Sequence, residues 1–222
     1  MSTTKSAAGS VRSPADRVLR HALIDRVFHW VTAAAVLTLL ATAFLPIVGL
    51  QFPWVAAHWI AGFVLIASIV FHVFRALLAQ SPRSMWIGGA DWRDLTSIAR
   101  WNLRLTSQPP RKPGKYSLAQ KLIHHLFALV LIAASITGAL MMVRIDTPWW
   151  ERNPYWLPAP TWGVIYVVHG LAALCLVTMV IAHVYFALRP EKLLFTRAMI
   201  RGWITRDEYR SHHDEQRWQV TE

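Results

Sequence analysis

The sequence contains one cysteine and few charged residues. Because Cys175 is the sole thiol among 222 residues, the chain can form neither an internal disulfide nor a cysteine-based metal site. Charged residues make up only 16% of the chain and hydrophobic residues 55%, whereas soluble domains average about 25% charged and about 45–50% apolar residues. The mean hydropathy is +0.33. These values exclude a disordered chain, a collagen-like repeat and a disulfide scaffold, and they indicate a membrane protein.

Acidic residues are also scarce. Asp and Glu number 12 against 23 Lys and Arg, which gives a net charge of +11. In a soluble protein such an excess would indicate nucleic-acid binding, but in a membrane protein it is typical of basic loops on the cytoplasmic side. We therefore expect membrane lipid around this chain and no nucleic-acid partner.

Long apolar runs, by contrast, are abundant. Four of them are long enough to cross a bilayer core, which takes about 20 helical residues, and a spanning backbone must satisfy its own hydrogen bonds. The four predicted spans are 28–50, 55–79, 121–143 and 162–188. Most tryptophans lie near span ends or in the adjoining loops, as in interfacial belts. The sequence thus predicts an all-α membrane protein, with a four-helix transmembrane bundle over 28–188 and terminal segments 1–27 and 189–222.

The distribution of basic residues predicts the orientation. The segments before, between and after the spans hold 5, 0, 9, 2 and 7 Lys and Arg in turn. Because basic loops stay in the cytoplasm, we expect both termini and the loop at about 80–120 there, and the loop at about 144–161 outside. Ala41-Thr-Ala43 resembles a signal-peptidase site. However, the 26 residues before this apolar run are long for a signal peptide and the run continues past the site, so we expect the span to be kept.

Both long loops have a marked composition. In the cytoplasmic loop, Trp92, Leu95, Ala99 and Leu103 recur at helical spacing with arginines between them. This pattern predicts a helix that lies either along the membrane interface or in the cytoplasm as a connector. The outer loop, 146–160, is rich in proline and tryptophan, and we interpret it as an interface cap or a docking surface.

Four histidines lie in the apolar spans in depth-matched pairs, although ionisable side chains are costly there. His169 and His183 are 14 residues apart, so they share one face of a helix and lie about 21 Å apart along it. His58 is at the outer depth of His169, and His29 is at the inner depth of His183. A b-type haem with two histidine ligands needs rings that face each other across a bundle, so the pattern predicts two haems. The second nitrogen of each ring needs an acceptor such as a carbonyl or a hydroxyl.

Other histidines leave alternatives open. His72 follows His58 by 14 residues and reaches the depth of His29, so spacing alone does not choose between His29 and His72 as the partner of His183. His124 and His125 lie at the inner edge of the third span. There they are either interfacial residues or neighbours of a quinone headgroup or haem propionate.

Several motifs between about Leu23 and Trp218 carry a resemblance to a known family. They are Leu23-Ile-Asp-Arg-Val-Phe-His29-Trp30, His58-x-x-x-Gly62, Gly114-Lys-Tyr-Ser-Leu-Ala-Gln120-Lys121, His169 with His183, and the tail Met199-Ile-Arg-Gly followed by His212-His213. Together they resemble the gamma subunit (cytochrome b556 type) of respiratory membrane-bound formate dehydrogenase and, more broadly, the prokaryotic di-haem cytochrome b anchors. The resemblance implies that His29 and His183 ligate a cytoplasmic-side haem and that His58 and His169 ligate an outer one. It leaves His72 as a bundle histidine.

The resemblance also implies a quinone pocket beside the inner haem. The family pattern before the third span is Gly-Lys-Tyr-Asn-x-x-Gln-Lys, in which the Asn and the Gln lie at the site for menaquinone or ubiquinone. Here Gln120 is kept and Ser117 replaces the asparagine. A serine hydroxyl still forms a hydrogen bond but reaches less far.

The implied mechanism assigns formate oxidation to a partner. A molybdenum or tungsten alpha subunit would oxidise formate at the outer face of the bacterial inner membrane. An iron–sulfur beta subunit would then pass electrons through this chain to quinone, with protons taken from the cytoplasm. This chain has no cysteine cluster, phosphate-binding glycine loop or nucleophile triad for the first step.

Three other functions are compatible with parts of the sequence. The chain could be the cytochrome b subunit of a nickel–iron hydrogenase or thiosulfate reductase, a stand-alone b561-like electron shuttle, or a haem-free transporter or anchor. The segment 114–121 and the His212-His213 tail favour formate dehydrogenase over the first. The loop 146–160 argues against the second, and the membrane histidines without an inverted repeat argue against the third.

Overall fold

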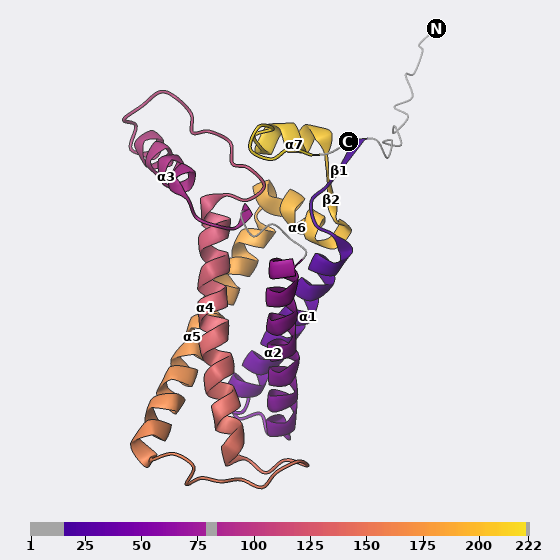
Figure 1. The fold of residues 1–222 in the computed structure, drawn as a ribbon. Coiled ribbons are helices and arrows are strands. Elements are labelled where there is room, and N and C mark those ends of the chain that lie inside the picture. The colour runs from indigo at the N-terminus through magenta and orange to yellow at the C-terminus, as the bar shows by residue number, and fades with distance from the viewer. Residues whose placement is uncertain (1–15, 79–83, 221–222) are drawn as a thin grey trace.

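The fold is built on four long helices that run side by side (Figure 1). This computed structural model describes residues 16–78 and 84–220. The helices are α1 (Leu23–Phe44), α2 (Trp54–Leu78), α4 (Leu118–Met141) and α5 (Ala159–Leu188). All four, with α4 extended by a 3-10 turn to Arg144, are long and apolar enough to cross a membrane. The prediction of a helical protein with four candidate spans is confirmed.

The bundle consists of two helical hairpins. α1 packs against α2 and α4 against α5, and the hairpins meet along the middle of the bundle (Figure 1). Their shared core is an apolar band of five buried residues, namely Ala35, Val36, Leu65, Leu131 and Leu176. Many other large apolar side chains of these helices are exposed. Such outward-facing side chains are expected where lipid, rather than water, surrounds a bundle.

The two ends of the bundle differ in what covers them. One end, called the loop end below, carries the links 45–53 and 145–158. The other, called the terminal end, carries the first and last described residues of the chain (Figure 1).

The first helix is shifted toward the N-terminus relative to the predicted span 28–50. It ends at Phe44 because Pro46 follows closely and Gly49, at φ +95°, turns the chain back toward α2. It begins at Leu23 with a turn that contains Asp25 and Arg26. A span predicted from hydropathy does not include such a polar turn, although the backbone is already helical there.

The tail forms a folded unit with part of the N-terminal segment. After a 3-10 turn at Pro190–Lys192 come α6 (Leu193–Arg201), β2 (Trp203–Thr205) and α7 (Arg206–His212). Strand β2 pairs antiparallel with β1 (Arg17–Leu19) around a core of Val18, Ala198, Ile204 and Tyr209. We call residues 16–20 and 193–220 the terminal cap. The rest of the predicted N-terminal segment, 1–15, lies outside the described residues.

The helix predicted in the middle loop is α3 (Gly89–Asn102), which lies beside the terminal end (Figure 1). Asp91 caps it by accepting a hydrogen bond from the Gly88 N–H at 2.9 Å, and it also binds Lys121 of α4 at 2.9 Å. Trp92 and Leu95 on this helix are exposed. The predicted helix therefore includes Trp92, Leu95 and Ala99, while Leu103 follows its last residue. One buried ion pair attaches the start of the helix to α4.

Candidate functional site

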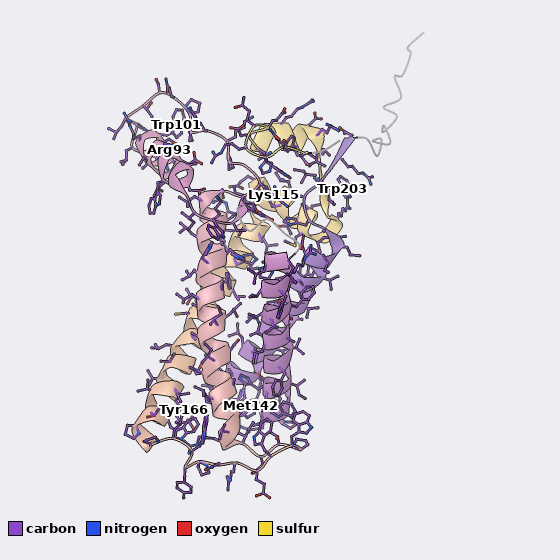
Figure 2. All side chains as sticks on the ribbon, in the orientation of Figure 1. Arg93, Trp101, Lys115, Met142, Tyr166 and Trp203 are labelled. Atoms are coloured by element: carbon purple, nitrogen blue, oxygen red, sulfur yellow. The ribbon has the colours of Figure 1, made fainter. Side chains whose placement is uncertain are left out.

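Four histidines from α1, α2 and α5 form two facing pairs between the helices, in which His29, His58 and His169 are half-buried and His183 is exposed. His58 and His169 form the loop-end pair, and His29 and His183 form the terminal-end pair. In each pair the ring centres are 6.3 Å apart. Figure 2 labels residues at the two ends of the bundle, with Met142 and Tyr166 at the loop end and Lys115 and Trp203 at the terminal end.

The ring separation in each pair suits a metal centre between two imidazoles. A metal–imidazole bond is about 2 Å long and the ring centre lies roughly 1 Å beyond the nitrogen, so two axial imidazoles place their centres about 6 Å apart. A bare ion takes about three or four protein ligands, but among the described residues no group of three or more His, Cys, Asp or Glu could hold one. A pair of facing histidines therefore fits haem, which brings its own equatorial nitrogens, better than a bare ion.

The loop-end pair is fixed by neighbouring side chains. Thr42 Oγ1 lies 2.8 Å from His58 Nδ1, and Thr137 Oγ1 lies 2.9 Å from His169 Nδ1. Gly138 lets the His169 ring approach α4, since a Cβ at that position would lie 3.2 Å from the ring atom Cε1. Sequence reasoning predicted that a hydroxyl or a carbonyl would meet the second nitrogen, but it did not identify these two threonines.

The terminal-end pair has different surroundings. His29 Nδ1 is buried and has no hydrogen-bond partner among the described residues. Within the same part of the chain no hydrogen bond is found for the His183 ring, which contacts Phe127 at 5.8 Å between ring centres. The edge of Trp30 meets His29 at 5.0 Å. In the described residues these two rings therefore have aromatic neighbours but no threonine hydroxyl of the kind found at the loop end.

His72 lies near the terminal-end pair but contacts other residues. Its ring stacks on Phe28 at 4.6 Å and meets His124 at 5.9 Å. His125 follows His124, and its Nδ1 lies 2.7 Å from the Lys121 carbonyl oxygen. The structure thus brings His29, rather than His72, opposite His183.

Ser117 and Gln120 form the N-terminal cap of α4. The Ser117 hydroxyl accepts a hydrogen bond from the Gln120 N–H at 3.3 Å, and Gln120 Oε1 accepts one from the Ser117 N–H at 2.9 Å. This reciprocal arrangement satisfies two backbone donors at the helix start. Both side chains are half-buried. The serine O–H and the glutamine NH₂ group are not used in these bonds, so each residue retains a donor for a ligand.

A buried hydrogen-bonded cluster around Arg20 joins the segment 114–121 to the terminal cap. Arg20 donates to His213 Nε2 at 2.8 Å and to the Lys115 carbonyl at 2.9 Å, while His213 Nδ1 lies 2.7 Å from the Gly114 carbonyl oxygen. Because a guanidinium only donates, Nε2 accepts, Nδ1–H donates and the imidazole is neutral. Burial lowers the pKa of His213 to about 4 and that of Arg20 to about 10. Burial, with Arg20 adjacent, lowers the pKa of His21 to about 3.

Comparison with known proteins gives consistent similarities along the chain. Residues 20–202 match the family described as prokaryotic cytochrome b561. The formate dehydrogenase cytochrome b556(fdo) subunit of Escherichia coli (strain K12) is 25% identical over 219 residues, which cover 91% of this chain and 92% of the relative. The probable Ni/Fe-hydrogenase B-type cytochrome subunit of Azotobacter vinelandii is 26% identical over 204 residues, covering 80% and 84%. Its counterpart in Rhizobium leguminosarum bv. viciae is 25% identical over 203 residues, covering 81% and 84%.

Proposed function

The chain belongs to the prokaryotic cytochrome b561 family, and we propose that it passes electrons from an iron–sulfur subunit of formate dehydrogenase across the membrane to quinone. It is a b-type cytochrome membrane subunit of the kind found in oxidoreductase complexes, with relatives named for formate dehydrogenase and for Ni/Fe hydrogenase. The observation that carries the proposal is the presence of two facing histidine pairs at two depths of one four-helix bundle.

We assign one haem to each pair, with His58 and His169 as axial ligands at the loop end and His29 and His183 at the terminal end. The equal ring separation of 6.3 Å supports this assignment. A b-type haem in each pair would supply a one-electron carrier at that depth. The chain's own residues hold the rings in position, and the apolar band around Leu65 and Leu131 fills the bundle between the two pairs.

We favour His29 over His72 as the second ligand of the terminal-end haem. The His29 ring lies opposite His183, whereas the His72 ring is stacked on Phe28 and meets His124. His72 is therefore interpreted as a bundle histidine.

We place the quinone site at the terminal end, beside the start of α4. A quinone carbonyl accepts hydrogen bonds, and Ser117 and Gln120 each retain a donor beyond those used in the helix cap. Reduction of a quinone by two electrons also takes up two protons. His124 and His125, about one turn further along α4 than Gln120, are the nearest histidines in this helix to the proposed site.

We propose that the terminal end faces the cytoplasm of a bacterium and that the loop end faces outward across the inner membrane. The link 45–53 has no Lys or Arg, and Arg152 is the only such residue in the link 145–158, while most of the basic residues lie in the segments of the terminal end. Positive charge in loops is retained on the cytoplasmic side. Protons for the quinone would then come from the cytoplasm.

The contact between two motifs favours formate dehydrogenase as the parent complex. The segment 114–121 and the His212-His213 tail each contribute to the resemblance, and they meet through the bond between His213 and the Gly114 carbonyl. A molybdenum or tungsten catalytic subunit would provide the electrons from formate through its iron–sulfur partner. A Ni/Fe hydrogenase is the second candidate, because relatives named for it have the same level of identity.

Haem analysis of the purified complex tests the assignment. We expect two b haems per chain, loss of one in His29→Ala and of none in His72→Ala, and quinone reduction that depends on formate. Folded chain without haem would refute the haem sites, and loss of haem in His72→Ala instead would move the inner ligand to α2. Quinone reduction with H₂ but not with formate would identify a hydrogenase.

A further inference from the structure

The two histidine pairs differ in the partners of their second ring nitrogens. Thr42 and Thr137 are 4% and 8% exposed, and each places its hydroxyl on the Nδ1 atom of one loop-end histidine. At the terminal end, His29 Nδ1 is buried without a hydrogen-bond partner in the part of the chain that the structure describes. The asymmetry is therefore between two rings whose second nitrogen meets a threonine hydroxyl and two rings for which no such hydroxyl is found among the described residues.

The direction of the loop-end hydrogen bonds follows from the backbone. Thr42 Oγ1 lies 2.7 Å from the Thr38 carbonyl oxygen, and Thr137 Oγ1 lies 2.7 Å from the Ala133 carbonyl oxygen. A hydroxyl has one proton, and a carbonyl only accepts, so each threonine donates to its own helix. The hydroxyl oxygen must then accept a hydrogen bond from Nδ1–H of the histidine.

This direction fixes the chemistry of the other ring nitrogen. In a neutral imidazole with a proton on Nδ1, Nε2 carries the lone pair that binds a metal. An acceptor on the Nδ1–H also makes a ligating imidazole more basic. A more basic axial ligand stabilises iron(III) relative to iron(II), and it therefore lowers the reduction potential of a haem.

We propose that Thr42 and Thr137 are positioning residues that orient the loop-end haem ligands and lower the reduction potential of that haem relative to the one at the terminal end. The inference rests on the proposed function, because it takes His58 and His169 as axial ligands. Electrons that enter at the loop end would then leave at the terminal end, toward the quinone, in the energetically favourable direction. The two hydroxyls would thus contribute to the driving force across the membrane.

Redox titration of the purified holoprotein tests the role of the hydroxyls. Thr42→Val and Thr137→Val keep the side-chain shape but remove the acceptor. We expect each variant to raise the midpoint potential of the loop-end haem by about 59 mV, which for one electron corresponds to a tenfold change in the reduction equilibrium constant. The terminal-end potential should stay unchanged, and the ferric electron paramagnetic resonance signal of the loop-end haem should shift. The spectroscopic signal that is lost in His58→Ala is assigned to the loop-end haem.

Two further variants separate the hydroxyl from general packing. Thr38→Val is the control for loss of a hydroxyl from the same helix, because Thr38 Oγ1 is also bonded to a carbonyl of α1, that of Ala34, and no hydrogen bond from Thr38 to a histidine is found among the described residues. Thr38 is exposed and Thr42 is buried, so Thr42→Ser is the variant that controls for packing. Thr42→Ser retains the hydroxyl and should keep the wild-type potential. If Thr42→Val loses the haem altogether, the proposal requires Thr42→Ser to keep both the haem and its potential.

Several results would overturn the proposal. They are unchanged potentials in both valine variants, an equal shift in Thr38→Val, or loss of the haem in Thr42→Ser as well as in Thr42→Val. The wild-type protein separates this failure from failure of the proposed function. Wild-type chain without two haems refutes the haem sites themselves, whereas two haems with potentials insensitive to the threonines refute only the role of the hydroxyls.

Discussion

Replacing Asp91 with asparagine tests how α3 is attached to α4 beside the proposed quinone site. Lys121 Nζ lies 2.9 and 3.0 Å from the two Asp91 carboxylate oxygens and 3.0 Å from the Trp86 carbonyl oxygen. Asp91 is 4% exposed and Lys121 is 9% exposed. Burial alone would raise the pKa of Asp91, but hydrogen bonds from Gly88 and Lys121 outweigh it and hold the pKa below its usual value. The carboxylate is therefore ionised at neutral pH.

The expected cost comes from the charge that stays behind. Asparagine has nearly the size of aspartate, so Asp91→Asn leaves the Lys121 ammonium buried without its counter-charge. Removal of one partner from a buried ion pair costs about 3–5 kcal/mol. At the lower limit of about 3 kcal/mol, the population in which α3 is detached would rise roughly a hundredfold.

Hydrogen exchange of the protein in lipid nanodiscs measures this detachment. We expect amides in 89–102 and 114–121 to exchange roughly a hundredfold faster in Asp91→Asn, while α5 stays unchanged. Asp146→Asn is the control, because the Asp146 pair with Arg152 is exposed on both sides and contributes little. The double variant Asp91→Asn with Lys121→Met should recover much of the protection. Exchange within twofold of wild type in Asp91→Asn would refute the reasoning.

Two glycines and one histidine give further predictions. Gly138→Ala should lower haem content at the loop end, because the added methyl would lie 3.2 Å from Cε1 of His169. Gly163→Ala, whose Cβ would meet nothing within 4 Å, is the control, and equal haem content in both variants would contradict this. Gly202→Ala should destabilise the terminal cap by about 1–2 kcal/mol, because Gly202 has φ +93°; an unchanged melting temperature would argue against it. Docking of the tail should weaken as the pH falls from 6.5 toward 4. In the folded tail the pKa of His213, about 4, lies below the ordinary histidine value of 6.5, so the unfolded tail binds the proton first. The free energy of tail docking keeps its full contribution from His213 above pH 6.5 and should fall by up to about 1.4 kcal/mol per pH unit below it. A hydrogen-exchange protection of the amides in 206–218 that does not change over this range would contradict the prediction.

The spans and the depths of the histidines could be predicted because they depend on local periodicity. A separation of 14 residues places His169 and His183 on one face of α5 whatever surrounds the helix. The choice between His29 and His72 was left open by spacing. It depends on how α1 and α2 rotate against each other, and that rotation is a result of packing.

The two threonines beside the loop-end histidines also could not be predicted from the sequence, because their role depends on packing between helices. The chemistry of imidazole predicted an acceptor on the second nitrogen, but Thr42 on α1 meets His58 on α2, and Thr137 on α4 meets His169 on α5. No pattern within one helix indicates which residue of its neighbour will be opposite.

The terminal cap could not be predicted for a related reason. Its strands, Arg17–Leu19 and Trp203–Thr205, are three residues long and come from opposite ends of the chain. A segment of that length has too few residues to show the alternation typical of a strand. The Gly114 motif and the His213 tail are 99 residues apart in the sequence, and only the structure shows that they are in contact.

Relatives named for two different enzymes match this chain at 26% and 25% identity. Which enzyme a cytochrome of this family joins must therefore depend on surfaces outside the histidine pairs. At the loop end, hydrogen bonds to residues next to the adjoining helices hold the link 145–158 in place. Asn153 N–H donates to the Val143 carbonyl at 2.8 Å, and the buried Trp162 donates to the Pro154 carbonyl at 3.1 Å. Within this loop Trp149 and Tyr155 are 67% and 92% exposed. A surface that is already ordered loses little entropy when a partner binds. We therefore propose this aromatic loop, next to the loop-end histidine pair, as the surface on which the enzyme that supplies electrons docks.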